Sequence, residues 1–192
     1  MGIQIIDRPL YPGQDGYGNG LTGVETTSRQ NCGLNNVPTM TSGVLRFAYF
    51  TPPATTVVSK CVTSTGGTAA GATPTLCRVG LYSVAANGDL TLVASMANDT
   101  TMWASTNTEY EKNLSASYTV VGGQRYAAAA LCVTGTTPPN LFGAVPSHGA
   151  SAVFARAPRL AAIVNSQTDL PASVSVGSLS NSTTSLWVGF VA

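Results

Sequence analysis

The sequence contains few charged residues. Asp, Glu, Lys and Arg make up 9% of its 192 residues, whereas an average soluble domain carries about 25%. Nine basic residues against eight acidic ones leave a formal net charge of +1. This balance excludes the basic surface that a nucleic-acid partner requires. No apolar run approaches the roughly 18 residues of a membrane span, so we expect neither a nucleic-acid partner nor a membrane segment.

Residues that bind metals are also scarce. The chain has one histidine, His148, and four cysteines, Cys32, Cys61, Cys77 and Cys132, with no C-x-x-C pair. Structural zinc sites need closely spaced ligand pairs, so we expect no metal and no cofactor. Cys77 and Cys132 each stand beside leucine in apolar runs, which is typical of buried free thiols. A disulfide between Cys61 and Cys77, which bracket a Gly/Ala/Thr loop, is the alternative.

Groups that could support catalysis are few and scattered. A glycosidase needs two facing carboxylates, and Glu109 with Glu111 is the nearest pair. Because Lys112 follows them, a solvated loop accounts for them more simply. His148 has no G-x-S-x-G serine to act on. The sequence therefore predicts a protein that is not an enzyme.

The residues that are abundant indicate β-structure. By count there are 25 Thr and 18 Ser, and 44% of the chain is hydrophobic. Short apolar or alternating runs are separated by Gly, Pro and Asn turns, and Asn87-Gly88 suits a type I′ hairpin. We expect an all-β fold, an antiparallel, jelly-roll-like β-sandwich over residues 41–192. The expected strands cover residues 44–51, 54–65, 75–84, 90–96, 113–121, 125–135 and 185–192.

Residues 1–40 lack both helical and strand periodicity. The stretch from Asp7 to Gly23 is dense in Gly, Pro, Asn and Tyr, a composition typical of an extended arm that orders against a partner. We expect the segment from Gly2 to Asn36 to attach the protein to neighbouring subunits. The candidate residues for this contact are Asp7, Arg8, Tyr11 and Tyr17.

Four aromatic residues lie in regions that read as loops. Tyr11, Tyr17, Trp103 and Tyr110 lie in stretches that contain Asn, Thr or Gly, and such rings can stack on sugars or fill a protein interface. They are the candidate ligand contacts. For Trp103, capping one end of the sandwich is an equally good interpretation.

Three stretches resemble a known family. They are AAGATPTLCRVGLYSVAANGDLTLVASMANDTT (residues 69–101), GGQRYAAAALCVTGTTPPNL (122–141) and QTDLPASVSVGSLSNSTTSLWVGFVA (167–192). Together they are similar to minor tail proteins of tailed phages that infect actinobacteria. This resemblance implies a non-enzymatic virion protein whose β-sandwich contacts a receptor or carbohydrate, with no catalytic motif to transfer.

Three functions remain open at this point. The first is a minor tail protein that contacts a host-surface glycan or receptor, and the second is a decoration protein on the phage head. The third is a free carbohydrate-binding module, which the lack of a signal-peptide pattern disfavours. Both virion functions predict other virion subunits as partners, location in the virion and a homo-oligomer such as a trimer.

Overall fold

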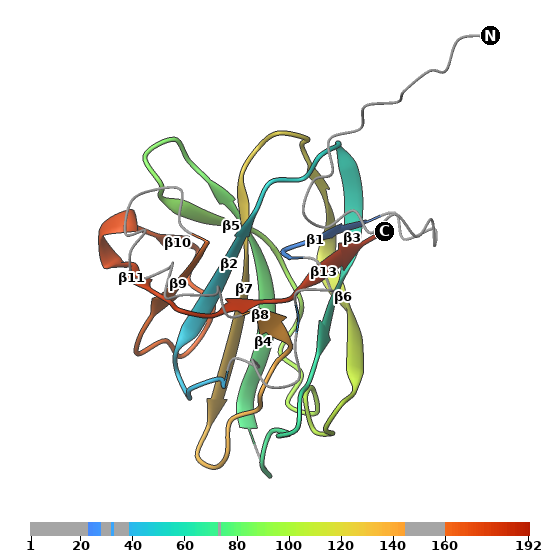
Figure 1. Ribbon diagram of the computed structural model, residues 1–192, viewed down its shortest axis with the longest axis vertical. Coiled ribbons are helices and arrows are strands. Elements are labelled where there is room, and N and C mark those ends of the chain that lie inside the picture. Colours follow the sequence, from blue (N-terminus) through green and yellow to red (C-terminus); the bar gives the residue numbers. More distant parts are fainter. Residues whose placement is uncertain (1–22, 28–31, 33–38, 73, 145–159) are drawn as a thin grey trace, which may run out of the picture.

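The protein is an antiparallel β-sandwich, as predicted (Figure 1). A computed structural model describes residues 23–27, 32, 39–72, 74–144 and 160–192. In these residues the helical structure is a single 3₁₀ turn, η3 (Val176–Ser178). None of the described helical structure is long and apolar enough to cross a membrane.

Eight strands form the two facing layers of a jelly roll. One sheet has the order β1-β13-β3-β6, and the centre of the other has the order β5-β4-β7-β2. The pairs β4–β5, β3–β6, β2–β7 and β1–β13 are nested antiparallel partners, which is the connectivity of a rolled-up hairpin. The strands are β1 (Gly23–Glu25), β2 (Leu45–Phe50), β3 (Thr56–Ser64), β4 (Pro74–Val84), β5 (Leu90–Ser95), β6 (Glu109–Val120), β7 (Tyr126–Thr134) and β13 (Gly189–Val191).

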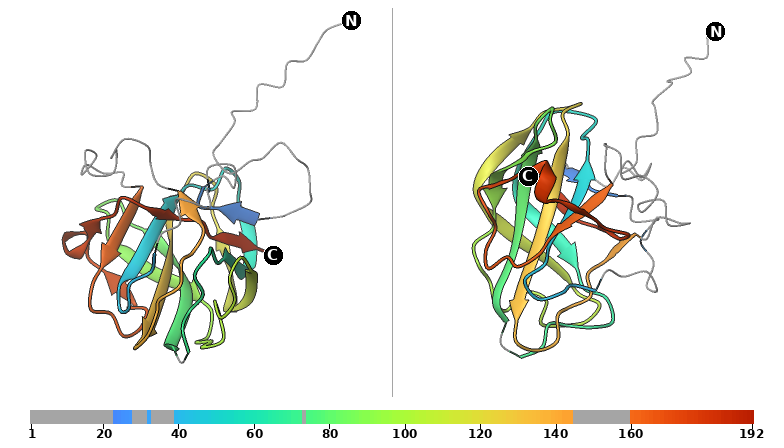
Figure 2. Two further views of the ribbon diagram at one scale, coloured as in Figure 1. Left: turned by 60° about the horizontal axis from the view of Figure 1, so that its bottom comes forward. Right: turned by 90° about the vertical axis from the view of Figure 1, so that its left-hand side faces the viewer.

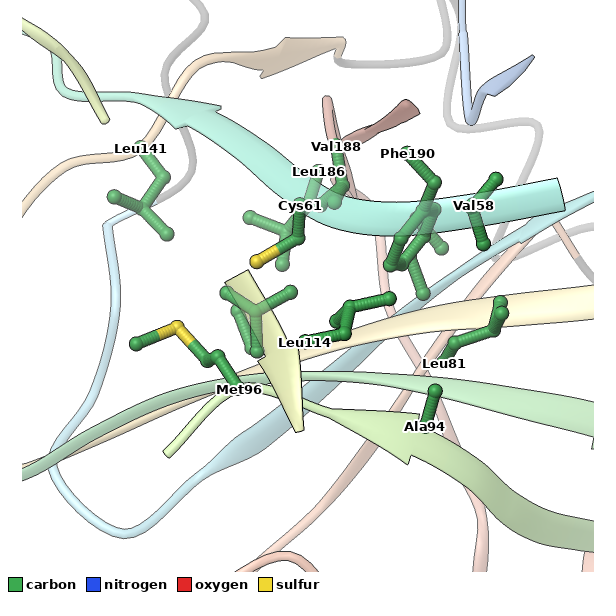
Figure 3. Close-up of a cluster of buried hydrophobic side chains, with 14 of the residues drawn as sticks. Val58, Cys61, Leu81, Ala94, Met96, Leu114, Leu141, Leu186, Val188 and Phe190 are labelled. Carbon is green, nitrogen blue, oxygen red and sulfur yellow. The ribbon is translucent and has the colours of Figure 1, made fainter. Parts of the chain in front are cut away.

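The main core lies between these two sheets. Figure 3 shows part of it, with Cys61 and Phe190 from the smaller sheet lying over Leu81 from the larger one and over Met96, which directly follows β5. Phe190 stacks on Phe50, with ring centroids 6.1 Å apart. Burial of this apolar surface is the main contribution to the stability of the sandwich.

Five further strands lie in the connection from β7 to β13. Three of them extend the larger sheet to seven strands, β10 and β11 at its two ends and β9 beside β2, while β8 and β12 form a small sheet of their own. Leu170, Val174 and Leu179 of this connection cover the outer face of the larger sheet and form a second core there. The bounds are β8 (Gly143–Ala144), β9 (Ala161–Val164), β10 (Ser173–Val174), β11 (Ser180–Asn181) and β12 (Ser185–Leu186).

Three outward-facing residues of β4 hold this connection. Arg78 Nη1 lies 2.6 Å from Asp169 Oδ1, and Tyr82 Oη donates a hydrogen bond to the Pro171 carbonyl at 2.9 Å. Between them, Gly80 leaves room for Leu170: a Cβ atom at Gly80 would lie 3.0 Å from Leu170 Cδ1. The segment is therefore packed on the sheet.

The two cores explain the composition of β7. Its Tyr126, Ala128, Ala130 and Cys132 face the main core, while Ala127, Ala129 and Leu131 face the second. A strand buried on both faces needs apolar residues at every position. The expectation that residues 125–135 form a central strand is therefore confirmed.

The predicted boundary between arm and sandwich at residue 40 is wrong for part of the arm. Gly23–Glu25 pairs with β13 as the first jelly-roll strand, and Val24 is buried in the main core. Met40 is buried there as well. A strand of three residues is too short to show an alternating pattern, so no local pattern marks it.

The predicted type I′ turn at Asn87-Gly88 is also corrected. Gly88 has a φ of +92°, but Asn87 is not among the residues with positive φ. The Gly88 N–H donates to the Ala85 carbonyl and the Ala85 N–H to the Asp89 carbonyl, each at 2.9 Å. This is the three-residue hairpin, a type I turn followed by a left-handed glycine.

Candidate functional site

Three connections meet at the end of the sandwich where β3, β5 and β7 finish. They are the segments 65–72, 96–108 and 135–142, called the loop end here, and they lie at the bottom of Figure 1. Backbone hydrogen bonds join them: Asn107 N–H donates to the Gly66 carbonyl (3.0 Å) and Gly71 N–H to the Thr137 carbonyl (2.8 Å). Loops tied in this way are arranged before any partner binds, which reduces the entropy cost of binding.

Thr65 is the centre of this arrangement. Its side chain is fully buried, and Oγ1 donates a hydrogen bond to the Ser105 carbonyl at 2.7 Å. The same oxygen accepts one from the Thr108 N–H at 3.0 Å. A hydroxyl that donates and accepts is fully satisfied despite its burial. Thr65 thus fixes the segment 105–108 to the end of β3.

Trp103 lies in this end but is not a ligand contact, and that prediction is corrected. Its side chain has 0% exposure and belongs to the main core. The indole Nε1–H donates to Thr63 Oγ1 at 2.9 Å, and the backbone adopts a φ of +65°. Trp103 therefore closes the end of the sandwich, the alternative interpretation of this residue.

Tyr110 supports the loop end from β6. Its ring is half-buried against the main core, and its hydroxyl oxygen accepts a hydrogen bond from the Ser105 N–H at 2.7 Å. The hydroxyl is thus engaged within the loop end while the ring stays partly exposed, and a ligand contact at Tyr110 stays a prediction. The other candidates, Tyr11 and Tyr17 together with Asp7 and Arg8, lie outside the described residues.

The exposed surface of the loop end is neutral and rich in hydroxyl groups. Asp99 is the one charged residue in its three described segments. Its carboxylate lies 2.6 Å from Lys112 Nζ. The exposed polar side chains are Asn98, Thr100, Thr101, Ser105, Thr106, Asn107, Thr136 and Thr137. Neutral hydroxyl and amide groups suit partners that are recognised by hydrogen bonds, such as sugars or uncharged protein surfaces.

Asp99 stays ionised at this end over the whole neutral and mildly acidic range. The Lys112 ammonium and the Thr101 hydroxyl, which donates at 2.6 Å, hold the pKa of the Asp99 carboxyl at about 2. The charge is thereby compensated locally, which leaves the rest of the loop end neutral. Sequence reasoning missed this surface because its signal, a run of Thr, Ser and Asn, is common throughout the chain.

The carboxylate pair considered for catalysis does not form a site. Glu109 and Glu111 are both exposed on the outward face of β6, and Glu111 Oε1 pairs with Lys60 Nζ at 2.7 Å. Their side chains point to solvent with no facing carboxylate from another strand in the described sheet. His148 lies outside the described residues. Within the described part of the chain, no group of three or more His, Cys, Asp or Glu could hold a metal ion.

The cysteines are arranged differently from the disulfide alternative. Cys61 is in β3 and Cys77 in β4, so they belong to different sheets. Cys61, Cys77 and Cys132 are free, buried thiols, which confirms the first interpretation for Cys77 and Cys132. Burial raises the pKa of the Cys61 thiol to about 12, so at neutral pH it is a protonated apolar group.

No protein-family model matches the chain, and no curated protein matches it in sequence.

Proposed function

We propose that the protein is a non-enzymatic structural component of a phage virion, a minor tail protein that presents its loop end to a host receptor or carbohydrate. The supporting resemblance covers about residues 43–192 and is carried by the stretches 69–101, 122–141 and 167–192. Jelly rolls are used by viral capsid and lectin domains, although a fold alone does not determine a function. The direction in which the chain enters and leaves the sandwich also supports the proposal, because it bears on which end of the sandwich faces outward.

Both ends of the sandwich chain lie away from the loop end. In the sheet register, Gly23 aligns with Val191 and Lys60, while Glu25 aligns with Gly189 and Val62. Because β3 runs toward the loop end, β1 enters from the opposite side and β13 leaves toward that side (Figure 2). Attachment through residues before Gly23 would therefore leave the loop end facing outward.

A decoration protein on the phage head is the second candidate. It is favoured by the same observation, because a single sandwich with both chain ends on one side needs only one attachment surface. Saturable binding of the purified protein to emptied heads would support it. Binding to free glycan without any incorporation into particles would instead favour the third function, a carbohydrate-binding module.

Charges introduced at the loop end test the proposed contact. The double variant Thr100→Lys, Thr106→Lys replaces two exposed hydroxyl side chains with ammonium groups that must be desolvated at an interface. We expect its affinity for envelopes of the host bacterium to fall by more than about tenfold, or 1.4 kcal/mol. The measurement is binding of labelled protein to purified envelopes.

The matched control is Ser117→Lys, Thr119→Lys. These residues are exposed on the outer face of β6, far along the strand from the loop end, and the charge added is the same. Its binding should equal that of the wild type. If both double variants bind as the wild type does, or both lose binding equally, the loop end is not the contact surface.

A further inference from the structure

Two cysteines face each other on β4 and β7, two neighbouring inner strands of the larger sheet. Cys77 of β4 and Cys132 of β7 are direct partners in the antiparallel register. Their sulfur atoms are 3.9 Å apart, and both side chains have 0% exposure. The pair lies in the main core, three residues after the start of β4 and two before the end of β7.

The backbone at this pair has the geometry that a cross-strand bond needs. The Cys77 N–H donates to Asn98 Oδ1 at 2.9 Å, and its carbonyl accepts from the Asp99 N–H at 3.2 Å. The Cys132 carbonyl accepts from the Gly43 N–H at 2.9 Å. The two residues therefore do not exchange backbone hydrogen bonds. Such antiparallel pairs have Cα atoms about 4.5 Å apart, within the range that a disulfide spans.

We propose that Cys77 and Cys132 are an oxidisable dithiol, which forms a disulfide joining β4 to β7 when the protein meets a small-molecule disulfide. One protein thiolate attacks a sulfur of the oxidant and expels one small thiolate, giving a mixed disulfide. The second protein thiol loses its proton and attacks the protein sulfur of that bond, expelling the second small thiolate. Two protein thiols are oxidised and one small disulfide is reduced to two thiols.

The surroundings of the pair favour Cys132 as the attacking sulfur. The Cys77 thiol can donate its hydrogen to the Cys132 sulfur, which lowers the pKa of Cys132, while the same contact and burial raise the pKa of Cys77. Access requires the ends of the two strands to open. A register shift between Pro74 and Leu76, directly beside the pair, places an irregularity where such fraying begins.

Formation of the disulfide does not depend on the proposed function, but the time at which it forms rests on that function. A virion protein folds in a reducing cytoplasm and then leaves the cell, so the bond would close after release. It would enclose a chain segment with ends 55 positions apart. Closing a loop of that length with a disulfide is expected to raise the melting temperature of a chain of this size by about 10 °C.

The test uses the full-length chain carrying Cys32→Ser, which removes the half-buried fourth cysteine. The protein is incubated in oxidised glutathione and analysed by intact mass and peptide mapping, then by thermal melting with and without a phosphine reductant. We expect a loss of about 2 Da, the two thiol hydrogens, a cross-linked peptide pair containing Cys77 and Cys132, and a reversible rise in melting temperature.

Two variants of this protein complete the test. Cys61→Ala removes a buried cysteine of the other sheet and should still form the bond, whereas Cys77→Ala should not. The peptide map of the parent protein decides the question even if Cys77→Ala folds poorly. Oxidation of the urea-unfolded protein in the same buffer shows that the buffer can oxidise these thiols. If the folded protein stays fully reduced in that buffer, the proposal is overturned. A cross-link through Cys61 also overturns it.

Discussion

Replacing Trp103 with alanine is expected to lower the free energy of unfolding by about 3–5 kcal/mol, as truncation of a buried aromatic side chain does. The variant loses the packing of a fully buried indole at the end of the main core. It also leaves Thr63 Oγ1 without the donor that now lies 2.9 Å away. Urea unfolding followed by circular dichroism measures the change.

The control for this variant is Tyr110→Phe. It keeps the ring and removes only the hydroxyl that binds the Ser105 N–H, so a cost of about 1 kcal/mol is expected. A Trp103→Ala variant as stable as Tyr110→Phe would contradict the assigned burial of Trp103. Loss of ligand binding by a Trp103→Ala protein that remains equally stable would restore this residue as a ligand contact.

Removing residues 2–22 is expected to reduce incorporation into phage particles by more than about tenfold, the loss of at least 1.4 kcal/mol of binding free energy. The sandwich begins at Gly23, so the free energy of unfolding should change by less than about 0.5 kcal/mol. Incorporation is measured by quantitative mass spectrometry of purified particles from a host that supplies the variant.

The deletion must stop before β1. Thr26 Oγ1 donates to the Leu186 carbonyl at 2.6 Å and accepts from the Val188 N–H at 3.0 Å. Deleting residues 2–36, the whole segment that the sequence assigns to attachment, would remove these bonds together with buried Val24. In a second variant, a Gly/Ser linker of equal length replaces residues 2–22. This variant tests whether incorporation needs the sequence of the segment or only its length. Full incorporation of either variant would contradict attachment through these residues.

The strands that sequence reasoning located are those whose pattern is local. Thr75–Val84 and Leu90–Met96 alternate on either side of a turn, and the structure has β4 and β5 within one residue of these bounds. The strand predicted from Asn113 starts four residues earlier, at Glu109. Charged residues at an exposed strand end resemble a solvated loop, because both are in contact with water.

The connection between β7 and β13 could not be placed from the sequence. Its strands have two to four residues, and its role depends on Leu170 reaching Gly80 across 90 positions of the chain. Long-range packing of this kind has no local periodicity. The stretch 167–192, which carries part of the resemblance, does include Asp169 and Pro171, which Arg78 and Tyr82 hold on the sheet.

The candidate site also depends on long-range packing that has no local pattern in the sequence. Capping of one sandwich end was an alternative interpretation for Trp103, whereas Tyr110 was expected in a loop and lies in β6; the exposure of neither residue was predictable. Trp103 has the positive φ of a tight turn. This backbone conformation directs its side chain into the core although the surrounding segment is polar. The hydroxyl-rich surface is assembled from three segments that only the fold brings together.

The most direct test of the central proposal is immunogold electron microscopy of the phage that encodes the chain, with antibody raised against the folded sandwich. For a minor tail protein, gold label is expected at the tail or its tip. Label spread over the head would contradict the tail assignment and support a decoration protein. Particles without label, in a preparation where a known tail protein is labelled, would contradict a place in the virion altogether.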